Sequence, residues 1–144
     1  MTQIHATAIA IDEQAILLCG ESGSGKSDLA LRLIEQGAQL VSDDRAELIN
    51  RGAELVAFPP PSIKGLLEVR ELGVLRFHSI DSAIVRLVVE LDSTHPLERM
   101  PELEMKTIEG VKIACVCLNP FYQSTPAKVS LALAVALGHI ERIE

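Results

Sequence analysis

Short apolar runs separated by polar turns dominate the hydrophobic pattern of this chain. Near the amino terminus, runs at 6–11 and 15–19 flank the polar turn Asp12-Glu13-Gln14. Two runs of this length around a short polar turn predict a β-hairpin. The run 15–19 is apolar at every position, which is typical of a strand buried on both faces. We therefore expect a hairpin whose second strand lies inside a sheet.

Similar runs continue along the chain and predict further strands. Two more pairs of runs flank polar or glycine-containing turns and are expected to form hairpins. A nine-residue, mostly apolar segment just past the middle, 83–91, predicts the longest strand. The further predicted strands are 39–42, 46–49, 54–57, 83–91, 104–109 and 111–118.

Helical periodicity is found in two segments. In 28–36, apolar side chains recur at helical spacing on one face, and Gly37 is placed to end the helix. The second predicted helix runs from Pro126 to about His139, with Thr125 as its N-cap and proline in the first turn. Strands and helices in this order indicate an α/β fold with a mixed sheet and flanking helices.

Two segments do not follow either period. Three consecutive prolines at 59–61 predict a rigid loop, and after them charges interrupt the apolar segment 62–75. That segment is either a solvated amphipathic stretch or one that presents Glu68 to a metal and phosphates. The polar segment 92–104 contains two prolines and is expected to be a long loop, a class of loop that often carries function.

Composition and charge narrow the function classes. The chain has 144 residues, enough for one domain with a core, and a net charge of −7 without a basic cluster. We therefore expect no nucleic-acid partner. The longest apolar helix candidate, 129–137, is far shorter than the roughly 20 residues that span a membrane, and residues 1–5 do not resemble a signal peptide. These features predict a cytoplasmic protein with no membrane partner.

The three cysteines are not arranged as a disulfide framework or a zinc site. Their number is odd, and no C-x-x-C pair occurs. Cys115 and Cys117 lie two positions apart in a predicted strand and hence on one face. We expect both to be reduced residues of the core.

A glycine-rich loop provides the strongest chemical signal. It follows the buried strand and precedes the first helix, and its sequence matches the pattern G-x-x-x-x-G-K-S. The glycines allow backbone N–H groups to point at phosphate oxygens, and the helix dipole favours the same anion. Lysine supplies a cation for the β and γ phosphates, and serine offers a hydroxyl to Mg²⁺. The predicted ATP-binding residues are Gly20, Glu21, Ser22, Gly23, Ser24, Gly25, Lys26 and Ser27.

Other polar residues are candidates for chemistry near this loop. Asp43 and Asp44 follow a predicted strand, where ligands of open α/β sheets bind. They fit a magnesium or general-base role, although aspartate is also common in turns and helix caps. His5 precedes the first strand and Arg99 lies in the long loop. Each is either a solvated surface residue or an active-site group.

These residues together resemble the HPr kinase/phosphorylase family. The resemblance covers about His5 to Arg99. Its elements are the phosphate loop, the paired aspartates, the segment Gly65–Val74, which is similar to the family signature, and the arginine of Glu98-Arg99-Met100-Pro101. The resemblance implies the P-loop core shared with phosphoenolpyruvate carboxykinase, as one catalytic domain over 1–144 without the amino-terminal domain of full-length members.

The resemblance also implies a function. The protein would be an ATP- and Mg²⁺-dependent serine kinase of HPr or an HPr-like phosphocarrier in phosphotransferase-system regulation, with inorganic phosphate as co-substrate of a reverse, phosphorylase reaction. A homo-oligomer is expected, since full-length relatives form hexamers. The implied catalytic residues are His5, Lys26, Asp43, Asp44 and Arg99, and the implied metal ligands are Ser27 and Glu68.

Departures from the family pattern keep other functions open. Glu71 stands where the family signature has glycine, and Pro126-Ala127-Lys128 replaces the late motif associated with phosphorylase activity. A non-catalytic ATP-sensing module that acts on a partner, such as a sensor kinase, is the alternative. A small-molecule kinase of the broad phosphate-loop group is a third hypothesis, which the hairpin before the loop and the paired aspartates disfavour.

Overall fold

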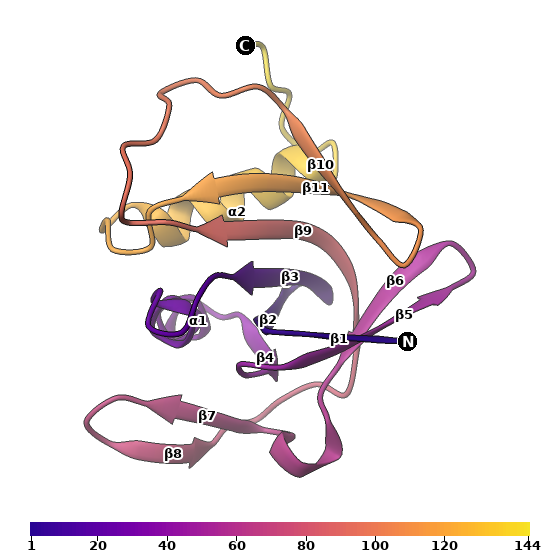
Figure 1. Ribbon diagram of the computed structural model, residues 1–144, viewed down its shortest axis with the longest axis vertical. Helices are drawn as coiled ribbons and strands as arrows, with labels where there is room; N and C mark the ends of the chain where they lie inside the picture. The colour runs from indigo at the N-terminus through magenta and orange to yellow at the C-terminus, as the bar shows by residue number, and fades with distance from the viewer.

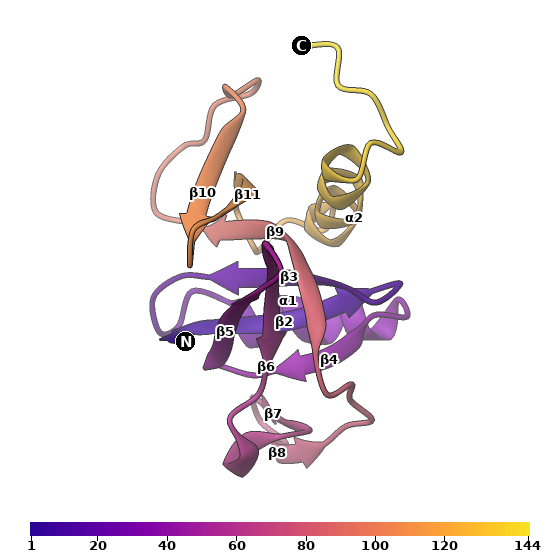
Figure 2. The ribbon, with the colours of Figure 1, turned by 90° about the vertical axis from the view of Figure 1, so that its right-hand side faces the viewer.

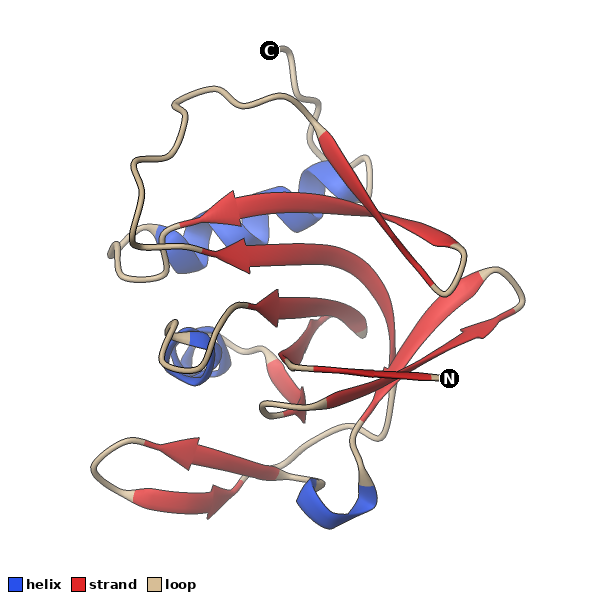
Figure 3. Cartoon of the chain, viewed as in Figure 1, coloured by secondary structure: helices blue, strands red, loops and turns tan.

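One curled, mixed sheet of nine strands organises the computed structural model, which describes residues 1–144 (Figure 1). Two α-helices pack on it, and a separate two-stranded hairpin extends below it (Figure 3). The strands are β1 (Thr2–Ile4), β2 (Ala6–Ile11), β3 (Gln14–Cys19), β4 (Gln39–Ser42), β5 (Ala46–Arg51), β6 (Glu54–Phe58), β7 (Leu66–Val69), β8 (Gly73–Arg76), β9 (Ala83–Leu91), β10 (Glu104–Ile108) and β11 (Val111–Leu118). The helices are α1 (Lys26–Glu35), the short 3₁₀ helix η1 (Pro61–Ile63) and α2 (Thr125–Ala136).

Four parallel strands direct their carboxyl ends to one edge of the sheet. β3 pairs in parallel with β9, and β9 pairs in parallel with β11. On the other side of β3, β2 runs antiparallel to both β3 and β4, so β4 is parallel to β3. The order of these parallel strands is therefore β4, β3, β9, β11, with β2 inserted after β4. The segments that follow these four strands meet at this edge.

The sheet is buried on both faces near its centre, as predicted for 15–19. Alternate residues of β3 enter two different cores, with Leu17 on one face and Ile16 and Leu18 on the other. The first core lies inside the curl, against β5 and β6. The second core lies under the helices, where Leu29 and Leu33 of α1 and Val129 of α2 pack.

The β7–β8 hairpin lies at the far end of the molecule from α2 (Figure 2). Leu67 and Val69 form a third small core with Leu40 of β4. The outer part of the hairpin is exposed, including the apolar side chains of Leu72 and Val74. This hairpin is the structure of the segment 62–75 that the sequence left ambiguous: it is anchored by its inner strand and solvated at its tip.

Most predicted elements are confirmed. The predicted fold class, an α/β fold with a mixed sheet and flanking helices, is confirmed, and each predicted strand and helix occurs within a few residues of its expected position. β1 was not predicted, because a three-residue strand is too short to display a period. No helix of the chain is long and apolar enough to cross a membrane.

Two local predictions are wrong. Ser124, rather than Thr125, is the N-cap of α2, because its carbonyl accepts the first helical hydrogen bond, from the Lys128 N–H at 3.0 Å. Thr125 lies inside the first turn, and its hydroxyl donates to the Asn119 carbonyl at 2.6 Å. Cys117 is exposed and is not a core residue. In the β10–β11 ladder, Glu104 at the start of β10 pairs with Cys115, so Cys117 lies beyond the region that β10 covers.

Candidate functional site

The phosphate-binding loop connects the end of β3 directly to α1. Gly23 and Gly25 have φ values of 82° and 94°, so both occupy the left-handed region that favours glycine. Gly25 is the N-cap of α1, and its carbonyl accepts the first helical hydrogen bond from Leu29 at 2.9 Å. The loop therefore ends at a helix N-terminus, an arrangement that binds anions. The Ser24 hydroxyl is buried there with no hydrogen-bond partner.

Lys26 is held inside its own loop. Only 5% of the residue is exposed, and its ammonium donates to the carbonyls of Gly20 and Glu21 at 2.9 Å each. A buried ammonium requires such oxygen partners. The lysine is thus positioned at the loop that is expected to hold the phosphates, whereas Glu21 and Ser22 are exposed at its tip.

Asp43 connects three segments through hydrogen bonds to one buried carboxylate. Its Oδ1 accepts from the Ser27 hydroxyl at 2.6 Å and from the Thr7 hydroxyl at 3.0 Å. Its Oδ2 accepts from the backbone N–H of Glu68 at 3.1 Å. The residue is 9% exposed. Asp43 consequently joins α1, β2 and β7 at the edge where the phosphate loop lies, and the expected proximity of the aspartate pair to Ser27 is observed.

Asp44 is the exposed neighbour of Asp43 and contacts His5 instead. Its Oδ1 lies 2.5 Å from Nε2 of His5. Two strand corners explain the contact. The chain bends at His5 between β1 and β2 and at 43–45 between β4 and β5, and β1 pairs with β5 while β2 pairs with β4. The two bends therefore lie against each other.

Thr7 is a site residue that the sequence analysis did not find. It is fully buried in β2, and its hydroxyl donates to Asp43 Oδ1 and accepts from the backbone N–H of Asp44 at 3.1 Å. It thereby fixes both ends of the Asp43–Asp44 peptide. Asp44 has a φ of 68°, a left-handed conformation that aspartate tolerates better than most residues. A threonine within an apolar strand was the only signal in the sequence.

The oxygen atoms around Ser27 suit a magnesium ion. Mg²⁺ prefers hydroxyl and carboxylate oxygens and is commonly held by one or two protein groups together with substrate phosphates. Ser27 provides the hydroxyl, and Asp43 and Glu68 carry carboxylates on segments joined by the hydrogen bond between them. No group of three or more His, Cys, Asp or Glu side chains is arranged to hold a metal ion without such phosphates.

Arg99 is not brought to this cluster. It is exposed in the segment 92–103, which leaves the edge of the sheet after β9 and runs towards β10 (Figure 1). Its one hydrogen bond is to the sulfur of the adjacent Met100 at 4.0 Å. His5, Lys26, Ser27, Asp43, Asp44 and the backbone of Glu68 thus meet at one edge of the sheet, and Arg99 is the predicted site residue without a contact to them.

Glu71 occupies a position that the backbone favours for glycine. Its φ is 76°, and the turn is closed by a hydrogen bond from the Leu72 N–H to the Val69 carbonyl at 3.0 Å. A positive φ at the third residue of a four-residue turn is the condition that usually selects glycine. The family pattern of glycine at this position therefore has a conformational reason, and the glutamate here is strained.

The cysteine beside the loop is not a candidate nucleophile. Burial, together with the nearby charge of Glu90, raises the pKa of the Cys19 thiol to about 12. The thiol therefore stays protonated at neutral pH, and a protonated thiol is a poor nucleophile. The same causes raise the pKa of Cys115 to about 11.

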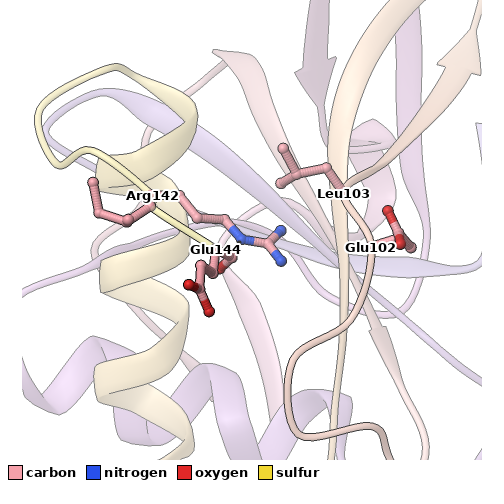
Figure 4. A pocket seen from close by; sticks show the side chains of 5 residues that line it. Glu102, Leu103, Arg142 and Glu144 are labelled. Atoms are coloured by element: carbon pink, nitrogen blue, oxygen red, sulfur yellow. Dashed lines mark hydrogen bonds between the residues drawn. The ribbon is translucent and has the colours of Figure 1, made fainter.

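A hollow of about 280 Å³ elsewhere on the surface contains none of the predicted site residues (Figure 4). It lies between the long loop and the carboxyl-terminal segment, where the guanidinium of Arg142 contacts the Pro101 carbonyl. Its lining residues are Glu102, Leu103, Arg142, Ile143 and Glu144. The hollow gathers no group suited to phosphate chemistry beyond one arginine already paired with backbone.

Comparison with known proteins identifies the family. Residues 1–121 match the family described as HPr Serine kinase C-terminal domain. An HPr kinase/phosphorylase of Limosilactobacillus reuteri (strain DSM 20016) is 30% identical over 146 aligned residues, which cover 93% of this chain and 43% of the relative. One of Shouchella clausii (strain KSM-K16) is 37% identical over 84 residues, covering 58% and 27%.

The fold has a counterpart among solved structures. The Hpr(Ser) kinase/phosphatase from Coxiella burnetii superposes with a TM-score of 0.84, covering 99% of this chain and all of that one at 23% identity. The chain spans less than half the length of the two curated relatives described above. The family match covers most of the chain and includes the phosphate loop and the aspartate pair, so this protein belongs to the HPr serine kinase C-terminal domain family.

Proposed function

We propose that this chain is the catalytic core of an ATP-dependent kinase that phosphorylates a serine of HPr or an HPr-like phosphocarrier. The names of its relatives support the reaction class. The observation that carries the proposal is the hydrogen bond between Ser27 and Asp43, because it joins the phosphate loop to the aspartate pair at one edge of the sheet. Phosphoryl transfer requires this proximity of bound triphosphate and acceptor-side acids.

The residues of the site divide the chemistry among them. The loop N–H groups and Lys26 bind the triphosphate, and Ser27 with Glu68, next to Asp43, holds Mg²⁺. When bound, Mg²⁺ would supply positive charge that stabilises the negative charge developing on the transferred phosphoryl group. Asp44, which is exposed, accepts the proton of the seryl hydroxyl while that oxygen bonds to the γ-phosphorus and the bond to ADP breaks. His5, paired with Asp44, orients this base.

The reverse reaction uses the same groups. An oxygen of inorganic phosphate bonds to the phosphorus of the phosphoserine as the bond from that phosphorus to the seryl oxygen breaks. Asp44 passes the proton of the attacking phosphate to the seryl oxygen, and pyrophosphate leaves. Arg99 acts on phosphoryl charge only if the segment 92–103 moves towards the loop, since it contacts none of the other site residues in this structure.

A transfer assay tests the proposal. The protein is incubated with γ-labelled ATP, Mg²⁺ and the HPr paralogues of its host, and the label is expected on a carrier serine. Lys26→Ala is the control variant: removing the cation that stabilises transferring charge is expected to lower the rate at least ~100-fold. Tight ATP binding without transfer to any carrier would contradict the kinase proposal.

The second candidate is an ATP-sensing module that acts on a partner. The lack of a hydrogen bond between Arg99 and the cluster, together with the strained backbone at Glu71, favours it. This function predicts hydrolysis and transfer at background rates together with partner binding that depends on ATP. Pull-down of a candidate sensor kinase with and without ATP distinguishes it from the kinase.

A further inference from the structure

Two sides of the phosphate loop differ in the residues that they present. The segment after β4 brings Asp43 and Asp44 to one side, and the segment after β11 brings residues 119–124 to the other, because β3 lies between β4 and β11 in the sheet. The first side is acidic and suits the reacting phosphate. If the terminal phosphate lies on the acidic side, a nucleotide that extends across the loop would bring its base to the side of residues 119–124.

Phe121 lies directly against the loop on this second side. A side-chain carbon placed on Gly25 would lie 3.1 Å from Cε1 and 3.2 Å from Cζ of the Phe121 ring. The ring thus packs beside the last glycine of the loop, at the N-terminus of α1. It is nevertheless 58% exposed, and much of its surface is free for contact with a ligand.

The segment that carries Phe121 is held in place by polar contacts. Arg32 of α1 donates to the carbonyls of Pro120 and Tyr122, the latter at 3.2 Å. The Phe121 N–H donates to Oδ1 of Asn119 at 2.9 Å. An exposed aromatic ring on an anchored backbone loses little conformational entropy when it binds a ligand.

Aromatic residues are scarce in this chain, which makes the position informative. The chain has three phenylalanines, one tyrosine and no tryptophan, and two of these four residues are adjacent and exposed at 121 and 122. The ammonium of Lys128 lies 5.1 Å from the centre of the Tyr122 ring, so a cation–π contact already uses one face of that ring. Phe121 has no such contact and is the available π surface.

We propose that Phe121 is the stacking platform for the nucleotide base, on the side of the phosphate loop opposite the aspartate pair. This inference rests on the proposed nucleotide-binding function. Stacking does not distinguish one base from another by its hydrogen-bonding edge, because every base has a π face. ATP and GTP should therefore both gain affinity from the ring, and inorganic tripolyphosphate should not.

Calorimetric titration with ATP, GTP and tripolyphosphate, each with Mg²⁺, tests the inference. Alanine substitution of a stacking aromatic weakens binding by about tenfold. Phe121→Ala should weaken the binding of ATP and of GTP by that factor and leave the affinity for tripolyphosphate unchanged. Phe121→Leu, which keeps apolar contact with the loop but lacks a π face, should behave similarly and guards against misfolding of the alanine variant. Tyr122→Ala is the matched control and should retain ATP affinity within about twofold.

Three outcomes would overturn the inference. They are unchanged ATP affinity in both Phe121 variants, equal weakening of ATP and tripolyphosphate, and wild-type protein that binds ATP no more tightly than tripolyphosphate. The second outcome would mean that the ring only shapes the loop. A different result would contradict the kinase proposal alone. In that case nucleotide binding would depend on Phe121, but no label would be transferred to a carrier serine.

Discussion

The corner between β4 and β5 and the tip of the β7–β8 hairpin both hold an acidic residue in a left-handed conformation, but they are stabilised differently. At the corner, Asp44 has a φ of 68° and its N–H donates to buried Thr7. At the tip, Glu71 has a φ of 76° in a solvated turn closed by one backbone hydrogen bond. The strained backbone at the corner is fixed by the buried hydrogen bonds around Asp43, and the strain at the tip has no such support.

This difference indicates which acids can act with defined geometry. Strain persists where the surrounding structure determines the conformation. Three hydrogen bonds to the Asp43 carboxylate hold that residue in place. The backbone of the adjacent Asp44 is therefore held as well, and its N–H donates to Thr7. Changes at the corner should therefore affect the reaction strongly, and changes at the hairpin tip should affect mainly local stability.

The largest effect is expected from Asp44→Asn. Asparagine tolerates the left-handed conformation, so the variant removes the proposed base and little else. Loss of a general base is expected to lower phosphoryl transfer by about 10²–10⁴-fold, measured with labelled ATP, while ATP affinity and the free energy of unfolding stay unchanged.

Asp43→Asn is the matched comparison for this prediction. Asp43 is buried and accepts three hydrogen bonds, so its substitution should lower both the transfer rate and, by about 2 kcal/mol, the free energy of unfolding. Full transfer by the Asp44→Asn variant would show that the base has been assigned to the wrong residue.

Thr7→Val is expected to have the next largest effect. Valine has nearly the same shape but removes the hydroxyl that donates to Asp43 and accepts from the Asp44 N–H. A buried N–H left without a partner costs about 1–3 kcal/mol, and transfer should fall by about tenfold as the corner loosens. Urea unfolding and transfer kinetics measure the two effects.

Thr7→Ser separates the hydroxyl from the methyl group. Serine retains both hydrogen bonds and loses one buried methyl, which costs about 0.8 kcal/mol. Its transfer rate should remain close to that of the original protein. Equal losses of transfer in the valine and serine variants would mean that packing of Thr7, rather than its hydroxyl, positions the aspartates.

Glu71→Gly tests the hairpin tip. Glycine adopts a φ of 76° without the penalty of about 1–2 kcal/mol that a side chain adds, although part of this gain is offset by the greater freedom of glycine in the unfolded chain. We expect the free energy of unfolding to rise by up to about 1 kcal/mol in urea titrations. A rise in transfer rate as well would identify the glutamate as a damper on catalysis.

Glu71→Ala is the control, because it removes the carboxylate and keeps the strained backbone. A higher rate in both variants would assign the damping to charge, and a higher rate in the glycine variant alone would assign it to the backbone. A glycine variant that is less stable than the original protein would contradict the strain at this turn.

The smallest effect concerns Asp92, whose side chain is 33% exposed, in contrast to the buried Asp43. The hydroxyl and backbone N–H of Thr94 donate to its carboxylate and lower its pKa from 3.8 to about 2. A lowered pKa in the folded state means that the contribution to stability is present above about pH 4 and is lost as the pH falls towards 2.

Unfolding by urea at pH 5 and pH 2.5 measures this contribution. The loss of stability between the two pH values should be smaller in Asp92→Asn than in the original protein. The effect is limited because solvent screens the partly exposed carboxylate of Asp92. An identical loss in both proteins would show that the Thr94 contacts do not persist in solution.

Local order along the chain was sufficient to predict most of the fold and the phosphate site. The hairpin of β2 and β3, the glycine loop and the helix α1 are all formed by residues close in sequence, so their hydrophobic period and turn residues specify them directly. The phosphate site could likewise be predicted from the pattern G-x-x-x-x-G-K-S, since the groups that bind phosphate lie within eight consecutive residues.

Only the tertiary structure decided that Asp43 is buried while Asp44 is exposed, and which distant residues contact each of them. His5 and Asp44 are separated by 39 positions, Thr7 and Asp43 by 36, and both contacts depend on two strand corners that lie against each other. Phe121 reaches Gly25 for the same kind of reason, because β11 and β3 end at one edge of the sheet. Sequence periodicity reports which face of a strand is buried, but it carries no information about which strand ends become neighbours.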